Sequence, residues 1–129
     1  MAKHLNPPTL PKPLGRYSQV VQAGGLVFIA GQTAVGLDGE MVGGDDPKAQ
    51  ARQVYANVQA AIESVGGTLD DIVKQTIYIT DGGFLPAVQE GRGAIWRDGH
   101  APTSTVVVCR GLARPEYLVE VEAIAVMGG

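Results

Sequence analysis

Apolar residues in the middle of the chain recur every three or four positions, the spacing that places them on one face of an α-helix. The stripe consists of Ala51, Val54, Tyr55, Val58, Ala61, Ile62 and Val65. Asp46 and Pro47 precede it as a favourable N-cap and a proline at the first helical position. Gly66 and Gly67 follow it and favour termination. The pattern predicts a helix over residues 47–65.

Shorter apolar segments with many β-branched residues predict strands on both sides of this helix. Residues 17–22 and 26–30 flank Ala23-Gly24-Gly25, a composition typical of a β-hairpin. The second hairpin strand is apolar throughout, so we expect it to be buried on both faces. Residues 37–42 are expected to form a turn and a short edge strand, and residues 72–80 a further strand.

The last third of the chain predicts two strands, residues 101–108 and 117–126, which we expect to pair with each other. Side chains two residues apart in a strand share a face. Glu120 and Glu122 therefore lie on the face that also carries Ile124, within an otherwise apolar ribbon. Burying an unpaired carboxylate is costly, so these glutamates either face solvent or line a wet cleft.

The order of the predicted elements indicates the fold class. A second helix is expected over residues 84–98, although Gly91 and Gly93 weaken it. Four prolines make residues 1–15 an extended arm. Hairpins mixed with crossover helices predict an α+β fold with a mixed sheet and both helices on one face. The other face would be an exposed apolar patch, so we expect oligomerisation through packed sheets.

Length and charge narrow the class of protein. A chain of 129 residues fits a single domain over residues 1–129. Its net charge of −3, without a run of Lys or Arg, gives no electrostatic basis for binding nucleic acid or an anionic membrane. No segment has the apolar length of a membrane helix or signal peptide. We therefore expect a cytoplasmic protein.

The residues that usually hold metals or form disulfides are sparse. Cys109 is the only cysteine, and His4 and His100 lie far apart in the sequence, so we expect neither an internal disulfide nor a metal site. Cys109 is expected to be a small buried residue, and His100 is expected to lie in a loop. Motifs for nucleotide binding, zinc hydrolysis or a serine nucleophile are absent from the sequence.

Five segments carry a resemblance that covers nearly the whole chain. They are residues 15–19 (GRYSQ), 28–32 (FIAGQ), 50–53 (QARQ) with Val58, 71–74 (DIVK) and 119–126 (VEVEAIAV). Each segment alone is weak, but their order and spacing together resemble the Rid family of reactive enamine and imine deaminases, also called YjgF or L-PSP.

The resemblance implies a chorismate-mutase-like α+β fold, assembled as a homotrimer whose sheets face inward, with three ligand clefts between neighbouring subunits. It also implies hydrolysis of small enamines or imines to a keto acid and ammonia, with no metal or organic cofactor. Tyr17 matches a tyrosine that lines the pocket, Gly31 a glycine at a strand end, and Glu120 a glutamate that positions or activates water.

The chain departs from the family at the arginine that binds the substrate carboxylate, a position that Ser104 occupies here. A neutral hydroxyl cannot replace the bidentate fork of a guanidinium. Arg16, which stands where the family usually has proline, is the candidate substitute, with Arg110 and Arg114 as weaker ones; a solvated surface residue is the other interpretation of Arg16. Gln89 falls near a polar family position on the second helix.

Three functions are compatible with this sequence. The first is an imine or enamine hydrolase that uses Glu120 and Tyr17 and has Ser104, Gly31, Arg16 and Gln89 around its substrate. The second is a trimer that binds a metabolite without catalysis, as a sensor or carrier. In either case Glu122 is a candidate contact to a neighbouring subunit. The third, an endoribonuclease, is disfavoured by the acidic charge and the lack of basic or aromatic platforms.

Overall fold

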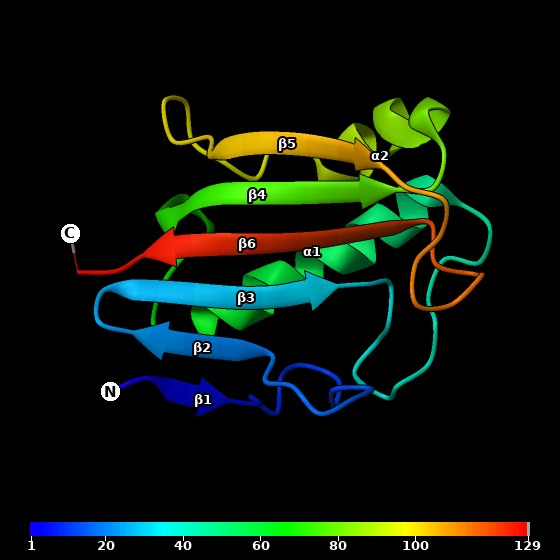
Figure 1. Cartoon of the computed structure of the whole chain (residues 1–129). Helices are drawn as coiled ribbons and strands as arrows, with labels where there is room; N and C mark the ends of the chain where they lie inside the picture. The colour runs from blue at the N-terminus through cyan, green and yellow to red at the C-terminus, as the bar shows by residue number, and fades with distance from the viewer. Residues whose placement is uncertain (129) are drawn as a thin grey trace.

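A computed structural model of the chain describes residues 1–128, which form one six-stranded sheet with helices on a single face (Figure 1). The strands are β1 (Lys3–Leu5), β2 (Val20–Ala23), β3 (Leu26–Gln32), β4 (Ile72–Ile79), β5 (Thr103–Val108) and β6 (Val119–Val126). The helices are α1 (Pro47–Glu63) and α2 (Leu85–Arg92), with the short 3₁₀ helices η1 (Leu69–Asp71) and η2 (Gly82–Phe84). The predicted α+β class, mixed sheet and one-sided helical layer are confirmed.

The strands lie in the order β1-β2-β3-β6-β4-β5. Only the β4–β5 pair is parallel, and the other neighbours run antiparallel. The predicted pairing of the last two strands is wrong, because β4 lies between them. The crossover through α2 returns the chain beside β4 as β5, and β6 then enters the centre of the sheet, where alternate side chains are buried under α1.

The long helix and its predicted cap are confirmed, although it ends at Glu63, two residues earlier than predicted. Asp46 Oδ1 accepts a hydrogen bond from the Lys48 N–H at 2.9 Å, and the predicted apolar stripe faces the sheet. The second helix is shorter than predicted. It ends at Arg92 because Gly93 takes a φ of +69°, in the left-handed region that glycine tolerates. Ile95 and Trp96 nevertheless still pack against the core.

The amino-terminal arm is attached to the sheet by a short strand and by buried amides. Lys3–Leu5 pairs with β2. The Gln19 side chain donates to the Pro11 carbonyl at 3.0 Å and accepts from Gln32 Nε2 at 2.8 Å. The edge strand predicted at residues 37–42 is absent, and that region makes a single bridge, between Val35 and Met41.

The face of the sheet opposite the helices, here called the open face, is uncovered in the single chain. Alternation in β6 is confirmed: Val119, Val121, Ala123 and Ala125 are buried under the helices, while Glu120, Glu122, Ile124 and Val126 belong to the open face. The same alternation in β3 leaves Leu26 and Phe28 each 41% exposed there. The prediction that this strand is buried on both faces therefore fails within one chain. None of the helices in residues 1–128 could span a membrane.

Candidate functional site

Glu120 lies on the open face at the carboxyl end of β3, directly against Gly31. A Cβ built on Gly31 would come within 2.8 Å of Glu120 Cδ and 3.1 Å of Cγ, closer than side chains pack. Glycine thus leaves room for the Glu120 carboxylate in its present position, and the backbone angles at Gly31 do not call for glycine. The structure brings together Glu120 and Gly31, two of the residues that the resemblance assigned to the site.

The electrostatics of this corner favour a protonated Glu120. Its side chain is half-buried, and burial followed by the charge of Glu122 raises its pKa above the ordinary value of 4.5. Tyr78 stands opposite Glu120 in the β4–β6 pair. Its hydroxyl donates to Glu122 Oε1 at 3.1 Å, and this bond raises the pKa of Tyr78.

Tyr78 is a member of this corner that the sequence pattern did not predict. The alternation in β4 indicates its face, but nothing local indicates that β4 lies beside β6 rather than beyond β5. Tyr78 and Glu120 are forty-two positions apart, and only the strand order makes them neighbours.

Tyr17 lies near Gly31, between the amino-terminal arm and the end of β3. Its exposed ring and Gly31 both line a small cavity of about 20 Å³ between the arm and the end of β3. The Tyr17 hydroxyl accepts a hydrogen bond from the Leu14 N–H at 3.4 Å. Arg16 next to it is exposed and makes no ion pair within residues 1–128.

Ser104 lies on the opposite face of the sheet from Glu120. Register places Ser104 beside Gln75, and Gln75 beside the buried Ala123. Gln75 Nε2 donates to Ser104 Oγ at 3.2 Å, and Gln75 Oε1 accepts from the Tyr55 hydroxyl of α1 at 2.8 Å. A single chain therefore cannot present Ser104 and Glu120 to the same small molecule.

The other candidate residues also lie away from Glu120. Gln89 is exposed on α2, on the helical side of the sheet. His100 is an exposed loop residue beside Arg97, as predicted. Cys109 is half-buried, with its thiol 3.6 Å from the Ile79 carbonyl oxygen. Arg114 pairs with Glu116 at 3.9 Å.

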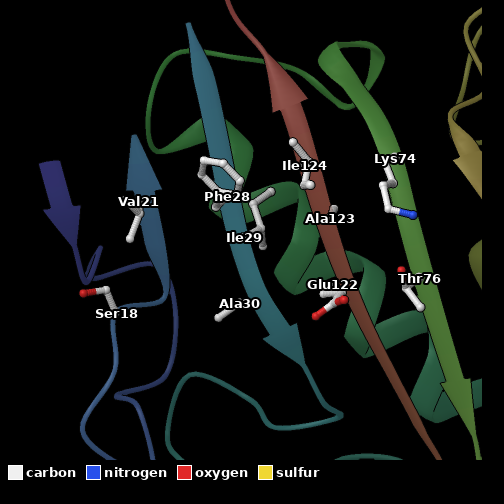
Figure 2. Close-up of a pocket in the computed structure, with 10 residues that line it drawn as sticks. All are labelled: Ser18, Val21, Phe28, Ile29, Ala30, Lys74, Thr76, Glu122, Ala123 and Ile124. Carbon is white, nitrogen blue, oxygen red and sulfur yellow. The ribbon is translucent and has the colours of Figure 1, made fainter. Parts of the chain in front are cut away.

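A groove of about 300 Å³ crosses the open face between β2, β3, β6 and β4. Figure 2 shows Phe28 and Ile124 over its apolar part, with Glu122 and Thr76 at the end nearer the carboxyl end of β3 and Lys74 along its β4 side. Its floor is apolar and its rim carries opposite charges. Such a lining fits burial against another surface better than exposure to water.

Comparison with known proteins identifies the family. A sequence model of the family described as "Endoribonuclease L-PSP" matches residues 8–127. A RutC family protein of Pyrococcus horikoshii is 38% identical over 116 residues, which cover 89% of this chain and 90% of that protein.

Solved structures agree with this assignment. YyfA of Yersinia pestis, a Rid family protein of unknown function, has a TM-score of 0.91 and 30% identity and covers 98% of this chain and 100% of its own. E. coli TdcF with bound serine has a TM-score of 0.87 and 32% identity, with coverages of 98% and 99%. The matching segments, the sheet with its one-sided helices and these likenesses show that the chain belongs to the Rid/YjgF/L-PSP family.

Proposed function

We propose that the protein is a hydrolase that releases ammonia from small imines or enamines, and that Glu120 handles the proton of the attacking water. The observation that carries this proposal is a half-buried carboxylate with a raised pKa, seated against a glycine at a strand end. Catalytic acids and bases work best when their pKa lies near the working pH, and burial moves Glu120 in that direction.

The chemistry needs no group beyond a carboxylate and water. Glu120, when ionised, accepts a proton from a water whose oxygen bonds to the C=N carbon, while the nitrogen takes up a proton from solvent. The resulting carbinolamine collapses when the C–N bond breaks, the hydroxyl proton passes to solvent and the nitrogen leaves as ammonia. Glu120 can return its proton to that nitrogen, so one residue serves both halves of the reaction. Tyr17 limits the space around the reacting carbon.

We also propose that the working particle is a homotrimer with open faces turned inward. Leu26, Phe28 and Val126 are exposed on that face, and a second copy would remove them from water. Glu120 belongs to the same open face, so packing of these faces would bring its carboxylate to a boundary between subunits. TdcF with bound serine, a small amino acid, supports a ligand of similar size here.

The direct test is the decay of 2-iminopropionate, generated enzymatically, with and without the protein. Glu120→Gln keeps the shape of the side chain and should lower kcat/KM by about 10²–10⁴-fold, the usual contribution of general acid–base catalysis. Glu63→Gln, at the exposed end of α1, is the matched control. Equal rates for Glu120→Gln and wild type would overturn the catalytic role. Saturable binding without turnover would favour a metabolite-binding trimer.

Assembly has its own test. Light scattering at micromolar concentration should give three times the chain mass, and Phe28→Glu should give a folded monomer because it places charge on the face that must be buried. An active wild-type monomer would refute the proposed assembly.

A further inference from the structure

Two carboxylates and a tyrosine lie together at one end of the open face, here called the acidic corner. Glu120 and Glu122 are on the same face of β6, so their side chains leave the strand about 6.5 Å apart. Tyr78 stands opposite Glu120 in β4, and its hydroxyl crosses to Glu122 Oε1 at 3.1 Å. This hydrogen bond holds the exposed second carboxylate beside the half-buried first one.

The acidic corner has no balancing cation in the part of the chain that the structure describes. Neither glutamate forms an ion pair there. Lys74 is the cation that lines the groove, but it stands opposite Ile124, about 13 Å along β6 from Glu120. Figure 2 shows Lys74 level with Ile124, and Glu122 level with Thr76 farther along the strands. The corner is therefore negative and accepts positive charge more readily than negative charge.

The proton inventory of the corner indicates the form in which an imine is bound. Glu120 must be ionised to take a proton from water. Tyr78 is a poor proton donor to a substrate, because its bond to Glu122 raises its pKa. The imine nitrogen therefore has its proton from solvent before the water attacks, as a planar iminium cation. A carboxylate on the same molecule would meet two acids and no opposing charge.

We propose that the acidic corner binds imines as protonated iminium cations and prefers molecules that carry no carboxylate. Glu122 accepts a hydrogen bond from the iminium N–H through Oε2, the oxygen that Tyr78 leaves free. Tyr78 is a positioning residue that fixes Glu122. This preference rests on the function proposed above and names its substrate class. The neutral Ser104, where the family carries arginine, agrees with it.

Packing between open faces favours the same kind of guest. Two carboxylates buried between subunits without a cation would be costly, and a planar cation bound between them offsets that cost. Phe28 and Ile124 line the apolar part of the groove, away from the corner, and a second copy can cover them without closing the acidic end.

Three probes of one shape measure this preference without turnover. Propionamidinium is a planar cation that resembles an iminium, propionamide is its neutral counterpart and propionate its anion. NMR titration of ¹³C-labelled glutamate carboxylates should show saturable binding of propionamidinium. Propionamide should bind at least about 10-fold more weakly, the smallest effect usual for losing a hydrogen bond to a charged group, and propionate should not saturate.

Glu122→Gln keeps the shape of the side chain and removes its charge, so it should raise the propionamidinium Kd by about 10-fold or more. Tyr78→Phe, which frees Glu122, should raise the Kd by about 3–10-fold, less than the loss of the charge itself. Glu63→Gln is again the matched control and should leave the Kd unchanged. Light scattering and thermal unfolding check the assembly and fold of each variant.

Unchanged propionamidinium affinity in a folded Glu122→Gln protein, or equal affinity for the three probes, would refute the preference. Glu122 would then serve as a contact to a neighbouring subunit. Unchanged affinity in Tyr78→Phe would reject the positioning role of Tyr78.

Turnover separates this preference from the proposed hydrolysis. Acetone imine, released enzymatically from isopropylamine, has a methyl group where 2-iminopropionate has a carboxylate. Its kcat/KM should be at least about 10-fold higher, and Glu122→Gln should narrow that ratio. Selective binding of propionamidinium with no hydrolysis of either imine would keep the preference and reject the hydrolase. Hydrolysis that depends on Glu120 but is equal for both imines would do the reverse.

Discussion

The Gly31→Ala substitution should displace the Glu120 carboxylate while leaving the stability of the fold nearly unchanged. The alanine Cβ would lie 2.8 Å from Glu120 Cδ, whereas ordinary contacts begin at 3.4 Å, so the carboxylate carbon must retreat by at least 0.6 Å (3.4 − 2.8). The carboxylate is the free end of a flexible side chain and can rotate outward. A displacement near 1 Å at a catalytic group costs up to about 10²-fold in rate.

We therefore expect Gly31→Ala to lower kcat/KM for 2-iminopropionate by about 10–100-fold. Gly31 has no positive φ, so alanine fits the backbone and the free energy of unfolding should stay within about 1 kcal/mol of wild type. The outward carboxylate should also titrate nearer the ordinary pKa of a glutamate, which ¹³C NMR can follow.

Gly111→Ala is the control, because a Cβ there would meet nothing within 4 Å and the residue has no positive φ. Full activity of Gly31→Ala together with an unchanged Glu120 pKa would refute the reasoning. Loss of folding would instead show that the strand end, and not the carboxylate, requires glycine.

Three further predictions concern pH and stability. The folded protein raises the pKa of Glu120 above 4.5, so between the two pKa values the folded chain keeps a proton that the unfolded chain has released. The contribution of this proton to the free energy of unfolding is therefore complete below pH 4.5 and is lost as pH rises through the raised pKa. Urea unfolding of wild type and Glu120→Gln can be compared from about pH 4 to 7 at one protein concentration. The free energy of unfolding of wild type should fall relative to that of the variant as pH rises, and a difference that stays constant with pH would contradict this. Gln50→Met should lower the free energy of unfolding by about 3 kcal/mol, because the fully buried Gln50 amide donates to the Gly44 and Glu116 carbonyls and accepts from the Leu118 N–H. A loss below about 1 kcal/mol in urea unfolding would show that water replaces these hydrogen bonds. Asp46→Ala should lower the free energy of unfolding by about 1 kcal/mol, because it removes the N-cap of α1. Asp45→Ala, at the preceding residue, is the control and should have little effect; equal losses in the two variants would argue against the cap.

Local pattern in the sequence was enough to predict most of the helices and strands and the faces of their side chains, though not β1 and not the absence of a strand at residues 37–42. The helical stripe, the Asp46 cap and the alternation around Glu120 depend on neighbours a few residues away, and the structure confirms them. The extent of α2 was predicted too long, because a single backbone angle at Gly93 ends it and helical spacing continues beyond that point.

Tertiary structure alone decided which strands are neighbours. The insertion of β6 between β3 and β4 is a non-local choice, made where its buried residues meet α1, and no short segment encodes it. That choice sets Tyr78 opposite Glu120 and places Ser104 on the other face, hydrogen-bonded to Gln75. Residue types and spacing predict which groups are chemically able to act; the order of strands determines which of them can meet.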